Sequence, residues 1–348
     1  MTEAISLERI GDAVDHLVTA PISNWTVLKG LPLAALHARS RAEAGGAVSL
    51  AASRLLIERV KPGDCVLLIT GFIIRDYDLP ETDGPIGAAV LGRTMTLALG
   101  ATPVAVCEPQ AHPAMRNCFE AAGLVSAELA TLGSGRNRCA VVDFPVDPAA
   151  AEVRAAELLD QLRPSAVIAI ERPAAGDDGH YHGGGGFEIT DFTAKTDTLF
   201  AAAQARGIAT IGIGDLGNEL GMGVVADEVR RSVPFGEQIA ASLAADVAVV
   251  ANISNWGAYG VAACLAAACN NEDAFHSAAA ELRLIEACNR GGAIDPVTGQ
   301  LSPLVDGTDA ATNAAMVDLL RSLVVLSVRG SSTIQSYQQS WRMGDAAP

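Results

Sequence analysis

The chain has 348 residues, with 24 basic and 40 acidic side chains and a formal net charge of −16. Such a surface repels nucleic acid and anionic lipid, which argues against both as partners. Half of the residues are hydrophobic and only 4% are aromatic, a composition typical of a soluble α/β protein. The stretch 1–17 is acidic and has no long apolar run, so we expect no secretory signal.

The sequence also argues against a membrane span and against a disulfide framework. No run of about 18 uncharged apolar residues is evident, and the apolar run 260–271 is short enough to be a buried helix. The seven cysteines are an odd number and include no Cys-x-x-Cys pair, which argues for a reducing compartment and against a disulfide framework or a thiolate zinc site. We therefore expect a cytoplasmic protein whose cysteines pack in the core.

Taken in chain order, apolar strand-like runs alternate with helical patterns. The runs are 65–70, 102–108, 139–144, 166–171, 208–214 and 246–251. Between the first two, a helix is predicted with Pro85 in its first turn and Gly100 just beyond its last. Another is predicted over 148–163, and helices dominate after 260. This order predicts an α/β fold with a mostly parallel, Rossmann-like sheet flanked by helices.

We divide the chain into an N-terminal helical segment (1–45), one α/β domain (46–335) and a C-terminal tail (336–348). Within the domain, four unusually polar loops each follow a strand-like run: 71–85, 171–188, 212–223 and 252–260. In a parallel sheet such loops open on one edge, where ligands bind at a switch in strand order. We expect the four loops to form one site at the carboxyl ends of the strands.

The loop 212–223 spaces Gly212, Gly214 and Gly217 as in a dinucleotide-binding turn. However, Asp215 and Glu219 would lie beside the phosphates. Three interpretations stay open. The loop binds a nucleotide, or it is a tight turn capped by Asp215 and Asn218. In the third, its carboxylates and free backbone N–H groups together bind a small zwitterion.

Two further loops place acidic residues at the expected site. Glu81 and Asp83 come just before the helix at Pro85, where Asp83 is a natural N-cap and Glu81 remains as an acid or base. Glu171 and Arg172 follow a strand. Arg172 either forms an ion pair with Glu171 or grips a substrate carboxylate through two hydrogen bonds.

The stretch 177–186 contains Asp177, Asp178, His180 and His182 ahead of a run of glycines. Its spacing matches no standard metal site, and a flexible lid over the crevice is the favoured interpretation. A divalent metal stays open as the alternative. Ser254 and Asn255 either start a helix or supply neutral donors to a polar ligand.

Together, these loops resemble the D-glutamate cyclase family. The matching pieces are "TGF" (70–72), "ETDGP" (81–85), "ERP" (171–173), "DGHYH" (178–182), "GDLGNELGMG" (214–223) and "SNWGAYG" (254–260). Two departures stand out: Leu216 replaces a family glycine, and His180 with the glycines of 182–186 replaces the family's usual Asn-Tyr stretch. These departures leave open a substrate other than D-glutamate.

The resemblance implies a hydro-lyase that closes D-glutamate to 5-oxo-D-proline and water. We expect no cofactor, because the spacing of Asp177, Asp178, His180 and His182 is irregular, and a divalent metal stays open. It implies a carboxylate base, Asp215 or Glu219, and an acid, Glu171 or Glu81. The implied substrate-binding residues are Gly71, Asp83, Arg172, Tyr181, Gly217, Asn218, Ser254 and Asn255.

Two other interpretations stay open. One is an enzyme acting on a related lactam, cyclic amide or hydroxy acid, including the ring-opening direction. The other is a non-catalytic sensor on the same scaffold. In each case the partner is a small amino acid or lactam, and homo-oligomerisation is left open.

Overall fold

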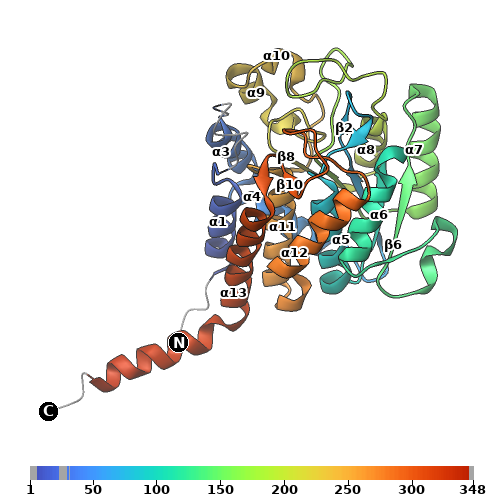
Figure 1. Ribbon diagram of the computed structural model, residues 1–348. Coiled ribbons are helices and arrows are strands. Elements are labelled where there is room, and N and C mark those ends of the chain that lie inside the picture. The colour runs from blue at the N-terminus through green and yellow to red at the C-terminus, as the bar shows by residue number, and fades with distance from the viewer. Residues whose placement is uncertain (1–5, 23–29, 31, 345–348) are drawn as a thin grey trace.

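The computed structural model describes residues 6–22, 30 and 32–344 and is built around one seven-stranded parallel sheet (Figure 1). The strand order is β5-β6-β4-β1-β7-β8-β9. Their bounds are β1 Cys65–Thr70, β4 Thr102–Cys107, β5 Val125–Ser126, β6 Arg138–Asp143, β7 Ala166–Ile170, β8 Ala209–Gly214 and β9 Val247–Val250. The predicted α/β class is confirmed, and each predicted run lies on a strand.

Helices cover both faces of this sheet (Figure 1). They are α1 Leu7–Val18, α3 Leu33–Ala44, α4 Val48–Arg59, α5 Pro85–Leu99, α6 His112–Ala121, α7 Pro148–Leu162, α8 Thr196–Ala205, α9 Ala226–Ser232, α10 Gly236–Ile239, α11 Ser254–Ala268, α12 Ala278–Arg290 and α13 Ala310–Gly344. Two small antiparallel pairs lie outside the sheet: β2 Ile73–Ile74 with β3 Leu79–Pro80, and β10 Leu304–Val305 with β11 Thr308–Asp309.

Strand side chains alternate between two apolar cores because successive residues point to opposite faces. In β1, Val66 and Leu68 join the core formed with α1, α4, α5, α6, α11, α12 and α13. Leu67 and Ile69 join the core formed with α3, α7, α8 and α9. Because both faces are covered, the strands are continuously apolar, which is why they are recognisable in the sequence.

The predicted helix boundaries hold where their signals are strong. Pro85 begins α5, and Gly100 ends it with φ 74°, the left-handed conformation that glycine adopts at little cost. The described cysteines form no disulfide, and five of the seven are buried.

The order in which the chain adds strands to the sheet reverses beside β1. The chain goes from β1 to β4 and β6 on one side, and later returns to place β7, β8 and β9 on the other. The carboxyl ends of β1 and β7 therefore form the switch point at which ligands bind in open parallel sheets.

Helix α13 is the feature that the sequence analysis underestimated. Its segment Ala310–Gly330 is long and apolar enough to cross a membrane by length and composition. However, 33% of its apolar 18-residue stretch is buried inside the protein. Met316, Leu320 and Val324 pack in the core beside α11 and α12, and the helix then extends away from the sheet (Figure 1). The absence of a membrane partner, the cytoplasmic location and the three-part division of the chain stay predictions.

Candidate active site

A cavity of about 390 Å³ lies at the switch point between β1 and β7. Glu81, Glu171 and Asp215 reach it from three of the four predicted loops. Phe72, Phe187 and Leu216 are among its apolar lining. Asn255, from the fourth loop, accepts a hydrogen bond from the Gly84 N–H at 2.9 Å. The predicted convergence of the four loops is therefore confirmed.

Asp83 and Asn255 join the starts of two helices beneath this cavity. Asp83 accepts hydrogen bonds from the N–H groups of Ser254 at 2.8 Å and Asn255 at 2.7 Å. Asn255 Oδ1 accepts from Gly84 and from Gly87 at 2.6 Å. Each residue thus caps the helix to which the other belongs. Both side chains are buried and saturated by the backbone, which supports a positioning role rather than the predicted contact with substrate.

Glu171 is held at the end of β7 in a backbone conformation that is unusual for a residue other than glycine. Its φ is 43°, and the Ser254 hydroxyl donates to its carboxylate at 2.6 Å. A non-glycine residue in the left-handed region costs free energy, and such residues cluster at functional sites. The backbone thereby aims this buried carboxyl into the cavity.

Four of the carboxyl groups that line the cavity share one electrostatic property. Burial raises the pKa values of Glu81, Glu171, Asp215 and Asp306 well above their usual range, and repulsion between neighbouring carboxylates raises them further. In Asp83, burial raises the pKa to about 7 despite three backbone N–H donors. Among the residues that the structure describes, the lining includes no Lys, Arg or His. The cavity therefore suits protons or cationic groups, including a substrate ammonium.

Glu219 lies under the glycine-rich loop and organises it. Its carboxylate accepts from the N–H groups of Asp215 at 3.1 Å, Leu216 at 2.9 Å and Gly217 at 2.7 Å, and its side chain is fully buried. Gly214 leaves room for this carboxylate, since a Cβ there would lie 2.4 Å from Glu219 Oε2. The expectation that these N–H groups are free for a ligand is wrong, and a pyrophosphate would find them already occupied.

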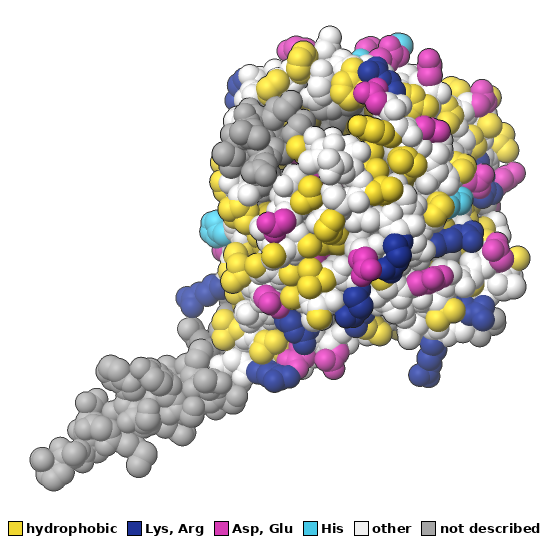
Figure 2. All heavy atoms as spheres, viewed as in Figure 1, with side chains coloured by type: hydrophobic (Ala, Val, Ile, Leu, Met, Phe, Trp, Pro, Cys, Tyr) yellow, Lys and Arg dark blue, Asp and Glu magenta, His cyan; other side chains and the backbone are white. Residues whose placement is uncertain are grey.

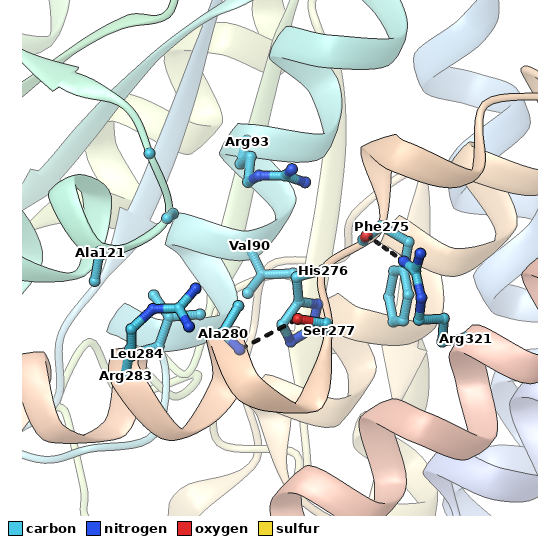
Figure 3. Close-up of a pocket in the computed structure, with 12 residues that line it drawn as sticks. Val90, Arg93, Ala121, Phe275, His276, Ser277, Ala280, Arg283, Leu284 and Arg321 are labelled. Carbon is cyan, nitrogen blue, oxygen red and sulfur yellow. Dashed lines mark hydrogen bonds between the residues drawn. The ribbon is translucent and has the colours of Figure 1, made fainter.

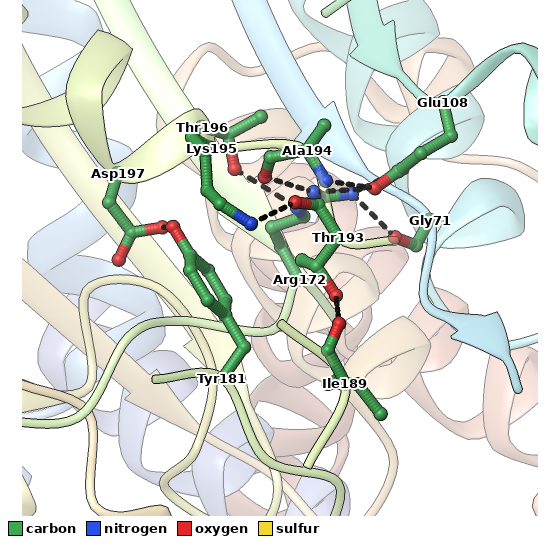
Figure 4. A network of polar contacts seen from close by, with 10 residues as sticks. All are labelled: Gly71, Glu108, Arg172, Tyr181, Ile189, Thr193, Ala194, Lys195, Thr196 and Asp197. Atoms are coloured by element: carbon green, nitrogen blue, oxygen red, sulfur yellow. Dashed lines mark hydrogen bonds and ion pairs between the residues drawn. The ribbon is translucent and has the colours of Figure 1, made fainter. Parts of the chain in front are cut away.

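Arg172 has a different role from the predicted one (Figure 4). Its guanidinium binds both carboxylate oxygens of Glu108 at 2.5 and 2.7 Å. Its other bonds go to the Gly71 carbonyl, the Ala194 carbonyl and the Thr196 hydroxyl. All of its N–H groups are engaged and its side chain is 0% exposed. The predictions of a substrate grip and of an ion pair with Glu171 are therefore wrong.

Gly71 and Tyr181 belong to the same network and not to the cavity lining. The Tyr181 hydroxyl donates to Asp197 at 2.7 Å, and its ring lies 4.7 Å from Lys195 Nζ (Figure 4). Of the predicted substrate contacts, Asn218 lines the cavity, whereas Gly217 lies beneath it with φ 97°.

The stretch 177–186 does not gather its acidic and histidine side chains into one cluster. Asp177 pairs with Arg230 at 2.7 Å and His180 pairs with Glu188 at 2.6 Å. The following glycines, 183–185, and Phe187 line the cavity instead. This is the position expected of a lid, although its movement stays a prediction.

Two other groups have donor atoms close enough to hold a metal ion. Asp83, Asp215 and Asp306 form one, and Glu171, Asp215 and Glu219 form the other, with all donor atoms of a group within 4.8 Å of one another. Carboxylate oxygens are the donors that Mg²⁺ and Mn²⁺ prefer. Asp215 belongs to both groups and lines the cavity.

Sequence reasoning missed one wall of the cavity. Residues 296–299 and Asp306 come from the segment between α12 and α13, which follows no strand of the sheet. Asp295 shapes this segment by accepting hydrogen bonds from Thr298 and Gly307. The feature of the sequence that could have indicated this wall was the Asp306–Gly307 pair, which is typical of a turn. Glu108 was also missed, because its partner Arg172 lies 64 positions away.

Comparison with known proteins identifies the family. The family model described as D-glutamate cyclase-like, C-terminal, matches residues 34–321. The chain belongs to this D-glutamate cyclase-like family. The mitochondrial D-glutamate cyclase of Homo sapiens is 44% identical over 100 residues, a stretch that covers 28% of this chain and 16% of that protein. The chain thus spans about a sixth of the human relative, and the D-glutamate cyclase-like region contains every residue of the cavity described above.

Proposed function

We propose that this chain is a hydro-lyase that closes D-glutamate, or a close analogue, to 5-oxo-D-proline with release of water. The main support is the cavity in which Glu81, Glu171, Asp215 and Asp306 have raised pKa values. Crowded carboxyls divide into protonated and ionised members at neutral pH, which provides an acid and a base in one place. Membership of the D-glutamate cyclase-like family supports the same reaction.

In the proposed reaction the substrate ammonium binds among the ionised carboxylates and loses a proton to Asp215. The amine nitrogen then attacks the γ-carboxyl carbon, so a C–N bond forms. Glu171 delivers a proton to the departing oxygen, and the C–O bond breaks to release water. The nitrogen loses two protons in all, and the departing oxygen gains two to become water. Proton exchange between the neighbouring carboxyls then returns Asp215 and Glu171 to their starting protonation states. Asp215 is preferred over Glu219 as base because it lines the cavity, whereas the carboxylate of Glu219 already accepts three N–H groups.

Turnover by the full chain tests this proposal. Loss of primary amine and formation of 5-oxoproline are followed with D-glutamate, L-glutamate and D-glutamine as substrates. Asp215→Asn keeps the shape but removes the proton acceptor, so kcat should fall roughly 10²- to 10⁴-fold. Asp160→Asn is the matched control, because Asp160 is exposed and pairs with Arg206. Binding of D-glutamate without turnover would instead identify a sensor, and turnover of only a lactam or hydroxy acid would identify a related enzyme.

The alternative to a cofactor-free reaction is one that uses a divalent cation. The observation in its favour is the pair of carboxylate groups that share Asp215. A cation there would neutralise the cavity and polarise the γ-carboxylate as a Lewis acid. Activity that survives exhaustive chelation supports the cofactor-free proposal. Activity lost on chelation and restored by Mg²⁺ or Mn²⁺ supports the alternative.

A further inference from the structure

A second pocket, of about 340 Å³, lies among α5, α12 and α13 and shares no lining residue with the acidic cavity. Its walls come from Val90 and Arg93 of α5, the turn after α6, the start of α12 and Arg321 of α13 (Figure 3). Figure 2 shows several Lys and Arg side chains over this region of the surface, among scattered acidic ones.

Three arginines from three different helices line this pocket: Arg93, Arg283 and Arg321. Their hydrogen bonds go to backbone carbonyls. Arg93 donates to Ala274 at 2.7 Å, Arg283 to Ala279 at 2.9 Å and Arg321 to Phe275 at 3.0 Å. In the part of the chain that the structure describes, none of the three forms an ion pair with a carboxylate. In the whole chain, acidic residues exceed basic ones by 16. Three arginines without a carboxylate partner around one pocket are therefore unexpected.

The electrostatic environment of Arg93 is unfavourable to its positive charge. Burial, followed by the positive charge of Arg321, holds the pKa of Arg93 below its usual range, and the negative charge of Asp273 offsets this only in part. An anion between these guanidinium groups would offset both effects, since it supplies the missing opposite charge and the missing acceptors.

The remaining polar groups of the pocket can also bind an anion. Ser277 is the N-cap of α12, a 13-residue helix, and its hydroxyl oxygen accepts a hydrogen bond from the N–H of Ala280. His276 is only 4% exposed, and its Nε2 pairs with Glu281 at 3.0 Å. Its Nδ1 has no hydrogen-bond partner among the described residues. A buried ring nitrogen without a partner is costly unless a ligand or water satisfies it. Because Nε2–H donates to the Glu281 carboxylate, Nδ1 can donate to an anion only as the imidazolium N–H, the form in which His276 and Glu281 make an ion pair. The nearby carboxylate of Glu281 is already engaged by His276 and by the Tyr259 hydroxyl.

We propose that this pocket is a binding site for a small phosphate-bearing anion. Guanidinium groups bind phosphate through paired hydrogen bonds, and Arg93, Arg283 and Arg321 approach from three helices, which suits a tetrahedral dianion. The start of α12 adds the favourable field of a helix N-terminus. Because the ligand would connect α5, α12 and α13, its binding stabilises the folded state.

Calorimetry and thermal melts of the full chain with inorganic phosphate and a small phosphate monoester test this proposal. Melts in sodium chloride of matched ionic strength remove the general effect of screening. Binding at one site, with a melting temperature that rises with phosphate and not with chloride, is the expected result. A response to malonate or succinate with none to phosphate would overturn the assignment of a phosphate group.

Two variants separate this site from general surface charge. Arg283→Gln removes an exposed guanidinium whose hydrogen bonding, within the described part of the chain, is to its own helix. This change should weaken phosphate binding roughly 10- to 100-fold. Arg290→Gln is the control on the same helix, because Arg290 is exposed, pairs with Glu286 and lies outside the pocket. Equal phosphate affinity in the two variants would overturn the proposal. Since the readout is binding, the result is independent of whether D-glutamate is turned over.

Discussion

The fully buried carboxylate of Glu219 shows how a single residue can organise the loop beside a reactive site. A glutamine there keeps one acceptor oxygen but places an NH₂ group against backbone N–H donors. Hydrogen bonds to a charged group contribute about 1.5–3 kcal/mol each. Glu219→Gln should therefore lower the free energy of unfolding by about 2–4 kcal/mol. Urea denaturation measures this loss, with the exposed Glu237→Gln as control. Unchanged stability with a large loss of kcat would restore the catalytic assignment that the sequence predicted.

Arg172 is the other residue for which burial decides the role. Removing one partner of a buried ion pair leaves an uncompensated charge, which costs about 3–5 kcal/mol. Arg172→Met should therefore destabilise the fold strongly, because Glu108 would stay buried without its partner. The double variant Arg172→Met with Glu108→Leu should recover part of the loss, since neither charge remains. Unfolding free energies of the single and double variants check this. A folded Arg172→Met protein with only a raised KM would show that the arginine binds substrate after all.

At the scale of elements, the strands could be predicted and parts of the site could not. Parallel strands that are buried on both faces are continuous apolar runs, so β1 and β7 are visible in the sequence. Because all such strands end at one edge, the meeting of Glu81, Glu171 and Asp215 could also be predicted. Asp306 could not, because it lies in the turn between the short strands β10 and β11, outside the seven-stranded sheet. The partners of Arg172 and Glu219 depend on tertiary packing, which residue type and spacing do not reveal.

The mutual capping of α5 and α11 gives a prediction at the same scale. Asn255 accepts the N–H groups of Gly84 and Gly87. Asn255→Ala therefore leaves the buried Gly87 donor without this acceptor, whereas the Gly84 N–H keeps its hydrogen bond to Asp83 at 3.0 Å. Loss of a cap of this kind costs about 0.5–2 kcal/mol, and a buried unsatisfied donor adds to it. We expect a lower melting temperature and also a lower kcat, since Glu81 and Asp83 lie on the segment leading into α5. Asn289→Ala, at a half-buried position that donates to the Ala293 carbonyl, is the control. A variant with normal stability and normal kcat would contradict this account of the two helix starts.

At the scale of the whole molecule, crowded carboxyls make folding stability depend on pH. The pKa values of Glu81, Glu171, Asp215 and Asp306 are raised in the folded state above their values in the unfolded chain. Between the two values the folded protein therefore binds more protons, and stability falls as pH rises. The stabilising contribution of these groups to the free energy of unfolding is fully present below about pH 4, near their pKa values in the unfolded chain. For Asp83, whose pKa is raised to about 7, this stabilising contribution is lost as pH rises from about 4 to about 7.

Asp215→Asn offers a direct measurement of this effect, because it removes one charge from the cluster without changing the shape of the side chain. Below pH 4 the variant and the natural protein should have similar stability, since the carboxyl is protonated in both states. As pH rises, the natural protein must ionise Asp215 against its neighbours, whereas the variant does not. The variant should therefore become the more stable of the two, by an amount that grows with pH. Urea denaturation at pH 5 and at pH 8 measures the difference, with Asp160→Asn as the exposed control. A difference that stays constant with pH would show that Asp215 is not held at a raised pKa, and would remove the electrostatic basis of the proposed acid–base pair.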